Sequence, residues 1–490
     1  MLSCRNINSN QRGIALLGAM VIVLVLSVLA TTLLNLSGQE AISASAAGQM
    51  AIAQQLADAS ADLVAGWFHD PQPTNAVPGI VSLRARRNHD ADGAPSFFDA
   101  TGHSQFVGSI DQPDFRLRAE NDSDNRVLND PEIGMFRTMG LLGQVEELKV
   151  YAPTDPGLLC TIDTTIATKT NPSVRQSVRM QLGALELPTL KAGVQVGRHL
   201  GLFHLGGESP VTVHWGDLKV GESLVLKLAK DLPRKSAIAP VTGQGYDETD
   251  QREDRWMEAW VGGSVQVTQP PVPPTTDVPA NLHVGQNPIP GIRLDEWPYE
   301  HLKRMAKRFG RYVAIDREGL LYPQGVVEFG KGLPPEEVLR SQVPGDQLGL
   351  IFIDTLDQTV PRADNLGVLK LRSPYLEGTI VMQGHVVLAP NGIGSTIQAL
   401  SPPTTDQGNV LARTPIQLSG MHFNGVLYAS GTITVGGKVK LYGAVVVGET
   451  IAPSDSGSSL EVWYDHDLGQ GLFRGLPIVY RAPGTWVARY

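Results

Sequence analysis

The 490-residue sequence predicts an α+β protein that is mainly β. Three observations lead to this prediction. Residues 14–34 carry no charge and are mostly apolar, and as a helix this run would span about 30 Å. Glycine (52) and proline (34) are abundant and aromatic residues make up 6%, which favours turn-rich β structure. Glycines at 425, 431, 437 and 443 recur every six residues between short apolar runs, which is typical of a β-solenoid.

The first element is a helix over residues 14–68. Beyond the charge-free run, apolar residues continue at helical spacing through Ile42 and Leu56 until Asp70-Pro71 ends the pattern. A single helix of this length extends about 80 Å. Its first half is apolar and long enough to span a membrane. Its second half is rich in Ala, Ser and Gln, and it is expected to pack on the protein's own head or on neighbouring helices.

Residues 1–13 form a short polar leader in which Arg5 and Arg12 are the only basic residues, and no Lys or Arg follows until Arg84. Because basic residues stay on the cytoplasmic side of a membrane span, the N-terminus is expected in the cytoplasm and the rest of the chain outside it. The apolar run is too long for the apolar region of a cleaved secretory signal peptide. An ordinary permanent single-pass anchor is the alternative interpretation.

The segment Gln11-Arg12-Gly13-Ile14-Ala15-Leu16-Leu17 and the run after it resemble the N-terminal segment of PilX-type minor pilins of type IV pili. The K-type minor pseudopilins of type II secretion systems have a similar start. The resemblance implies that residues 1–13 are a prepilin-type leader, which a prepilin peptidase removes by cutting after Gly13. It also implies that the new N-terminus at Ile14 is methylated, and that residues 14–68 are a transmembrane and assembly helix.

By the same resemblance, the helix would lie in inner-membrane lipid first and then pack against other pilins or minor pilins, with the later domains in the periplasm or on the cell surface. The residues expected to take part are Leu16, Leu17, Gly18, Val21, Leu24 and Val28. Gly18 departs from the major pilins, which carry Glu at the fifth mature position. An uncompensated carboxylate is costly in a bilayer, so its absence eases membrane residence. The departure favours a minor, priming or tip-located subunit over the repeating body of a fibre.

The rest of the chain is expected to contain little further helix. Strands are predicted at 115–119, 145–151 and 174–182, where apolar residues alternate with polar ones. A compact sandwich with glycine turns competes with the solenoid interpretation of the C-terminal region. The predicted segments are a pilin-like α+β head at 69–188, a β-rich module at 189–268, a Pro-rich linker or loop at 269–290, a connector at 291–345 with a helix at 295–309, and a β-solenoid-like domain at 346–490.

Several polar groups invite a functional interpretation, and in each instance an ordinary structural role is expected instead. The acidic segments 90–93 and 121–125 lack the full ligand pattern of a calcium loop and are interpreted as solvated turns. His214 and Asp217 have no identifiable third catalytic partner, so turn chemistry explains them better. The basic residues of the predicted helix at 295–309 are expected to form a solvated face that complements the helix dipole.

The sequence predicts no cofactor, no metal centre and no enzymatic activity, because it contains no zinc, nucleotide-binding or hydrolase motif. A net charge of -9 argues against nucleic acid as a partner. Of the two cysteines, Cys4 would leave with the leader, so Cys160 has no internal disulfide partner. The function expected is that of a minor pilin-like subunit that primes assembly or sits at a pilus tip, with surface adhesion as a further role. The alternatives are a type II secretion pseudopilin and an anchored periplasmic β-solenoid that binds or cleaves polysaccharide.

Overall fold

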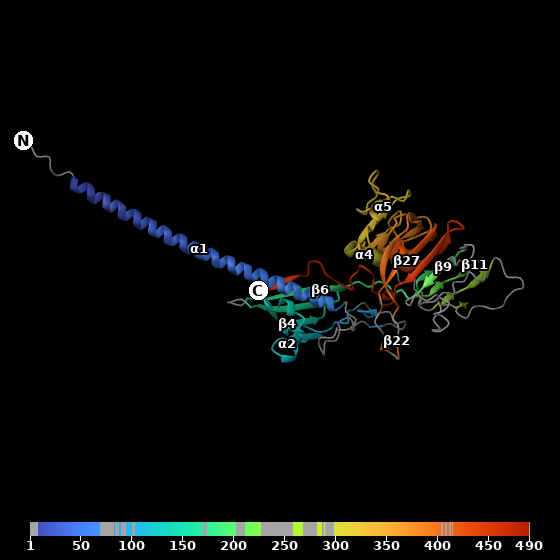
Figure 1. The fold of residues 1–490 in the computed structure, drawn as a ribbon, viewed down its shortest axis with the longest axis horizontal. Coiled ribbons are helices and arrows are strands. Elements are labelled where there is room, and N and C mark those ends of the chain that lie inside the picture. Colours follow the sequence, from blue (N-terminus) through green and yellow to red (C-terminus); the bar gives the residue numbers. More distant parts are fainter. Residues whose placement is uncertain are drawn as a thin grey trace, which may run out of the picture. The chain divides into compact units, whose positions relative to one another are not determined.

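The structure is a computed structural model, and it describes residues 8–68, 83, 88–89, 95–99, 103–169, 174–201, 211–226, 258–267, 282–286, 289, 298–402, 405–406, 409–410, 413 and 415–489. The chain divides into two compact units (Figure 1). We call the first the head unit, made of Met1–Arg86, Phe98–Gly183 and Tyr480–Tyr490, and the second the solenoid unit, made of Arg87–Phe97 and Ala184–Val479. The predicted calcium-like segment 90–93 lies outside the described residues.

The head unit is organised around helix α1, which runs unbroken for 60 residues from Asn8 to Trp67. It therefore begins before the position that the sequence predicts. Only its C-terminal part buries a face, at the three- and four-residue spacing of one helix side. The buried residues of this face are Ala53, Leu56, Ala57, Ser60, Ala61, Val64 and Trp67. Three of them are alanines, and this small-residue face brings α1 close enough for Thr164 Oγ1 to donate a hydrogen bond to the Ala57 carbonyl at 3.4 Å.

An antiparallel sheet receives this helix face. Its order is β3-β4-β5-β6-β30, with β31 also pairing with β6. The bounds are β3 Phe115–Arg118, β4 Gly143–Tyr151, β5 Cys160–Thr168, β6 Arg175–Ala184, β30 Val479–Arg481 and β31 Val487–Arg489. Three of these strands match those predicted from alternation, whereas β5 was not predicted. The acidic segment 121–125 is not a solvated turn, because Asn121 caps helix α2, Asp122–Asn129, by accepting a hydrogen bond from the backbone N–H of Ser123.

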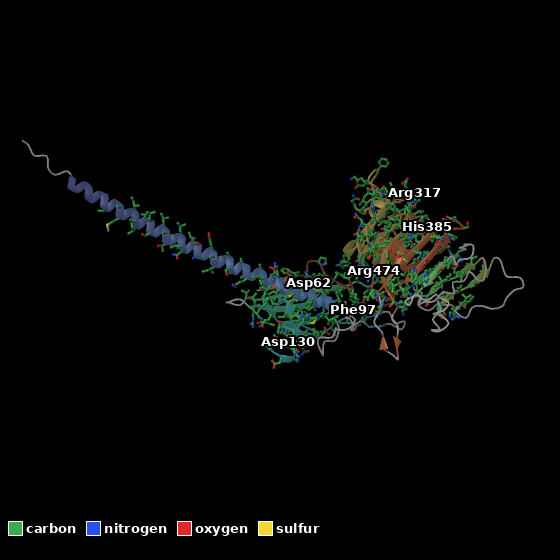
Figure 2. The ribbon with its side chains drawn as sticks, in the orientation of Figure 1. Asp62, Phe97, Asp130, Arg317, His385 and Arg474 are labelled. Atoms are coloured by element: carbon green, nitrogen blue, oxygen red, sulfur yellow. The ribbon has the colours of Figure 1, made fainter. Side chains whose placement is uncertain are left out.

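The chain leaves the head at β6 and returns to it at β30, next to β6 in the same sheet. Residues 480–490 therefore belong to the head unit and not, as predicted, to the domain at 346–490. The returning tail also binds the outer side of α1. Arg481 pairs with Asp62, which is labelled in Figure 2. Trp486 Nε1 donates to Asp58 at 2.6 Å. The larger segment of the solenoid unit, Ala184–Val479, is thus inserted between two neighbouring strands of the head.

Two long parallel sheets build the solenoid unit, as the glycine spacing predicts, and the compact sandwich is excluded. Sheet 1 has the order β14-β12-β10-β7-β27-β25-β19-β17-β15-β16, parallel except for the terminal β15–β16 pair. Its strands are β7 Val194–Val196, β10 Leu218–Val220, β12 Ala259–Val261, β14 Leu282–Val284, β15 Arg311–Ile315, β16 Leu321–Tyr322, β17 Leu350–Ile353, β19 Leu376–Met382, β25 Phe423–Ala429 and β27 Lys438–Val447.

Sheet 2 has the order β13-β11-β8-β28-β26-β20-β18. Each of its strands follows a strand of sheet 1, so one coil of the solenoid contributes one strand to each sheet. A shorter third run, β9-β29, pairs with the first half of β27. The bounds are β8 His199–Leu200, β11 Ser223–Leu226, β13 Ser264–Val267, β18 Gly367–Leu371, β20 Gly384–Leu388, β26 Ile433–Val435 and β28 Thr450–Pro453, with β9 Val211–His214 and β29 Ser459–Tyr464.

The coils do not stack in the order of the sequence. β7 and β8 pair with β27 and β28, which lie about 250 residues later in the chain. The chain therefore enters the solenoid in its middle, builds outward to β14, continues at the opposite end with β15, and builds back until β27 closes on β7. Each of the predicted segments 189–268, 269–290, 291–345 and 346–490 consequently contributes described strands to one continuous solenoid.

Glycines form a column at the corner between the third run and sheet 1. Gly378, Gly425 and Gly443 are in register on neighbouring coils, with φ of 150°, 135° and 132°. A Cβ on Gly443 would lie 1.8 Å from the carbonyl oxygen of Gly425, and one on Gly425 would lie 2.1 Å from that of Gly378. Only glycine fits this column, both because of its φ and because the backbones approach so closely.

Helix α4, Tyr299–Phe309, packs on β15 and β17 near one end of sheet 1, within the predicted helix 295–309. The remaining described elements are short: β1 Asn88–His89, β2 Pro95–Ser96, a 3-10 turn at Arg137–Met139, α5 Pro335–Val338, the hairpin of β21 Ser395–Leu400 with β24 Pro415–Met421, the pair β22 Thr405–Asp406 with β23 Asn409–Val410, and a 3-10 turn at His466–Gln470.

Candidate assembly surface

The N-terminal half of α1 exposes apolar side chains on every side. Among the described residues, this is the one helix long and apolar enough to cross a membrane. Thirteen large apolar side chains up to Leu36 are exposed: Leu17, Met20, Val21, Ile22, Val23, Leu24, Val25, Leu26, Val28, Leu29, Leu33, Leu34 and Leu36. At roughly 1.5–3 kcal/mol each, enclosing them releases about 20–40 kcal/mol. This surface requires an apolar environment that no described part of the chain supplies.

The polar groups within this stretch are satisfied inside the helix. Ser27 donates to the carbonyl of Val23, Thr31 to that of Ser27 and Thr32 to that of Val28, at 2.6–2.8 Å. In lipid, a hydroxyl without such a partner would be left without a hydrogen bond at considerable cost. These side chains are therefore compatible with a helix that lies in a bilayer or inside a helix bundle.

The structure places the predicted site residues as follows. Gly13, Ile14 and Leu16 lie within α1, and their side chains are outside the described part of the structure. Leu17, Gly18, Val21, Leu24 and Val28 lie on the exposed apolar stretch. A Cβ added to Gly18 would meet nothing within 4 Å. The fold of this chain does not require glycine there, so any requirement for a small residue at position 18 comes from a neighbouring molecule.

Charge is nearly absent from the helix. Between residues 14 and 68 the sequence contains three acidic residues and no Lys or Arg. Two of the three, Asp58 and Asp62, bind the tail of the head unit, as described above. Glu40 lies on the exposed part of α1 between apolar and small residues, and within the described part of the structure no side chain pairs with it.

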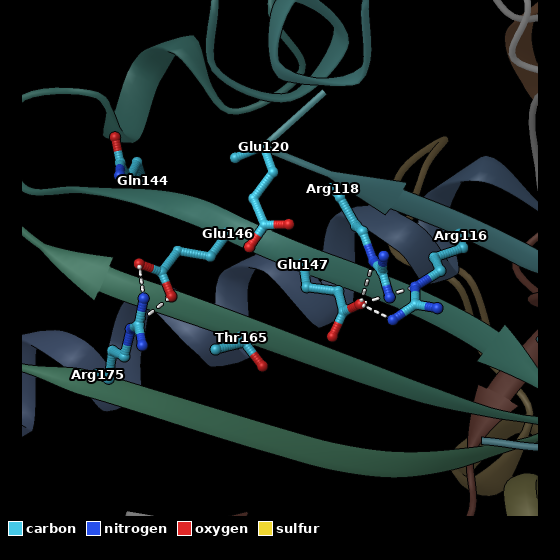
Figure 3. Close-up of a pocket in the computed structure, with 9 residues that line it drawn as sticks. Arg116, Arg118, Glu120, Gln144, Glu146, Glu147, Thr165 and Arg175 are labelled. Atoms are coloured by element: carbon cyan, nitrogen blue, oxygen red, sulfur yellow. Dashed lines mark hydrogen bonds and ion pairs between the residues drawn. The ribbon is translucent and has the colours of Figure 1, made fainter. Parts of the chain in front are cut away.

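A second surface, which is polar, lies in the head unit on the face of the sheet that points away from α1 (Figure 3). A cavity of about 530 Å³ is lined by charged side chains of both signs. Arg116, Arg118 and Lys149 all pair with Glu147, and Arg175 pairs with Glu146 at 2.8 Å. These ions largely neutralise one another, so the cavity is a polar face with charges of both signs.

In the solenoid unit, His214 and Asp217 do not form an acid–base pair. The His214 ring stacks on Trp463 with centroids 3.8 Å apart, and its Nε2 lies 3.2 Å from Glu461. Burial tends to raise the pKa of Glu461. The interactions of Glu461 with His214 and Lys440 outweigh this effect of burial and lower the pKa to about 2. Burial raises the pKa of Asp217 to about 6, against the opposing effect of Lys219. The turn between the two residues is made by Trp215, with φ of 65°.

The predicted solvated basic face of α4 is partly wrong, because Lys303 lies in a buried network that the sequence did not reveal. Its Nζ is 2.8 Å from Asp354, a residue with no exposed surface. Tyr299 and Tyr312 donate their hydroxyls to the same carboxylate at 2.7 and 2.5 Å. This network joins α4 to β15 and to the end of β17. Among the described residues, no group of three or more His, Cys, Asp or Glu side chains is placed to hold a metal ion.

Comparison with known proteins gives a limited result. No family model matches the chain, and no curated protein matches it. Among solved structures, the chain is similar to the competence-associated pilin ComZ from Thermus thermophilus, with 13% sequence identity and a TM-score of 0.26 over 71% of this chain and 84% of that chain. The likeness is to a pilin and does not specify the PilX type. At this identity and TM-score, it does not place the chain in a family.

Proposed function

We propose that this chain is a non-enzymatic, minor pilin-like subunit. Helix α1 anchors it in the inner membrane after synthesis and later packs among the helices of other pilins. The observation that supports this proposal is the division of α1 into two parts. The exposed apolar part is stable only when lipid or other helices enclose it, whereas the C-terminal part packs on the sheet of the head. A minor role at a priming or tip position is favoured by Gly18 and by the large solenoid unit.

The order of events follows from this division. The leader would keep Gly13 on the cytoplasmic side, where a prepilin peptidase would cut the bond to Ile14 and methylate the new N-terminus. The head and solenoid units would lie in the periplasm, because no basic residue follows Arg12 until Arg84. Release of α1 from lipid then costs little only if neighbouring helices enclose the same apolar surface.

The decisive experiment measures the N-terminus of the exported protein. The full chain is expressed with and without the prepilin peptidase, and its intact mass and N-terminal sequence are determined. We expect Ile14 as a methylated N-terminus only when the peptidase is present. Gly13→Val should abolish processing, whereas the matched control Gly18→Val should be processed normally, because a side chain at position 18 meets nothing in this chain. A leader retained by the wild type in the presence of the peptidase would refute the proposal.

Pilus and secretion systems are separated by a second measurement. The processed protein is sought in sheared surface fibres from cells that carry either a type IV pilus system or a type II secretion system. Recovery with the pilus supports the proposal as stated. Recovery only with the secretion system would show that the chain is a pseudopilin.

A further inference from the structure

Glu40 is an acidic residue on the exposed part of α1, and no side chain in the described part of the structure pairs with it. Its side chain is exposed, as are those of its neighbours on α1. The other carboxylates of α1 are held by Arg481 and Trp486 of the tail, but within the described residues Glu40 has no such partner. Before assembly this is tolerable. Residue 40 lies about 9 Å beyond Leu34, the end of the apolar run, and this distance places its carboxylate among lipid headgroups and water.

Assembly changes the environment of this carboxylate. If neighbouring helices enclose α1, as the proposed function requires, they remove water from residue 40 as well. A carboxylate that loses its water without gaining a partner is strongly disfavoured, and a positive charge that the neighbour brings to the level of residue 40 would offset this cost. The surrounding residues permit a close approach, because residues 41–48 contain only Ala, Ser, Gly and one Ile.

A second copy of this chain cannot supply that charge from its helix, because residues 13–83 contain no Lys or Arg. The amine that processing would create at Ile14 is 26 residues from position 40, or about 39 Å along the helix axis. A copy shifted by that distance would place its residues 14–34 beside residues 40–60. The apolar residues 14–34 of the first chain would then remain without an apolar neighbour from that copy.

We infer that the helix packed against Glu40 belongs to a different subunit, which carries a basic side chain or an N-terminal amine at that level and pairs with this carboxylate. The inference rests on the proposed function and adds the chemistry of its partner. It also gives a physical reason for a minor subunit, since α1 does not complement itself.

The test uses the full-length chain in membranes of cells that express the complete set of pilus subunits. A photo-crosslinking amino acid at Ala44, one turn from Glu40, reports the neighbouring helix. The wild type should crosslink to a different subunit and not to itself. Glu40→Gln should reduce this heterotypic product at least tenfold. The matched control Gln55→Glu, an exposed polar position on the same helix, should leave it unchanged.

Charge reversal supplies the second arm. Glu40→Lys alone should also lose the heterotypic product. When the Glu40→Lys variant is co-expressed with the wild type, a variant copy and a wild-type copy should crosslink to each other. Neither protein should form such a homotypic crosslink when it is expressed alone. A homotypic product in the wild type alone, or a Glu40→Gln variant that crosslinks like the wild type, would overturn the inference. Leader processing is measured in the same samples. Its absence in the wild type would refute the proposed function, whereas normal processing with unaffected variants would refute only the pairing of Glu40.

Discussion

Substitution of Gly443 by alanine should disrupt the middle of the solenoid, whereas the same substitution at Gly437 should be mild. Gly443 lies in the corner column, and a Cβ there would lie 1.8 Å from the carbonyl oxygen of Gly425. That neighbour is backbone, so the coils must separate locally to make room. Gly437, only six residues earlier, also has a positive φ of 73°, but a Cβ there meets nothing within 4 Å.

The expected magnitudes differ accordingly. At Gly437 the cost is that of a left-handed conformation, about 1–2 kcal/mol. At Gly443 a comparable backbone cost is joined by overpacking of about 1–3 kcal/mol and by the loss of two or three ladder hydrogen bonds at about 1 kcal/mol each. The sum is about 4–8 kcal/mol, a large share of the 5–15 kcal/mol that typically stabilises a domain.

Hydrogen–deuterium exchange of the detergent-solubilised full chain measures this effect where it arises. Peptides from β25 and β27 should exchange much faster in Gly443→Ala than in the wild type. In Gly437→Ala they should remain close to wild type, and peptides from the head strands β4 and β5 should be unchanged in both variants. Equal protection of β25 and β27 in the two variants would refute the steric explanation of the glycine column.

Three further predictions concern the packing and charges of the two units. Ala57→Leu should lower the free energy of unfolding of the head by about 1–3 kcal/mol, because it overpacks the contact of α1 with β5; denaturant unfolding measures this, and Ala51→Leu, at an exposed position, should have no effect. Lys303→Met should destabilise the solenoid by about 3–5 kcal/mol by leaving Asp354 buried without its cation. Addition of Asp354→Asn should recover much of this loss, and a double variant as unstable as the single one would contradict the ion-pair explanation. The pKa of Asp217 is raised from 3.8 to about 6, so folding favours its protonated form, and its contribution to stability is full below pH 4 and is lost as the pH rises through 6. Asp217→Asn should therefore stabilise the solenoid at pH 8 but not at pH 4 in thermal unfolding, and equal effects at both pH values would refute this assignment.

The sequence predicted the elements whose residues follow a local pattern. The spacing of apolar residues in α1 and the alternation in β3, β4 and β6 depend on side chains close together in the chain. The recurrence of Gly425 and Gly443 likewise reflects a geometric demand that neighbouring coils share. Strand β5 was missed because its Thr164 and Thr161 are buried, so it does not alternate between apolar and polar residues. Thr164 donates to a carbonyl of α1 and Thr161 to the carbonyl of Ala152, just after β4, and no local pattern reveals these partners.

The domain boundaries illustrate the same limit. Nothing near β7 in the sequence indicates that its partner is β27, because the pairing depends on how distant coils close on one another. The return of residues 480–490 to the head depends on Arg481 and Trp486 meeting carboxylates more than 400 residues earlier. For the candidate site, the exposed apolar surface of α1 was predictable from composition. The isolation of Glu40 became visible only when the tail was seen to hold Asp58 and Asp62.

The closure of β27 on β7 has a consequence for biogenesis. Because the chain is synthesised from its N-terminus, the coils from β7 to β14 are made long before β27 is available. During that interval β7 presents an open strand edge, the kind of surface on which chains aggregate. The C-terminal coils can build from β15 without this delay, and β27 then pairs with the open edge of β7. Productive folding of the solenoid is therefore limited by the arrival of residues near 447. A chain interrupted just before them would leave two separate half-stacks, each with an exposed strand edge.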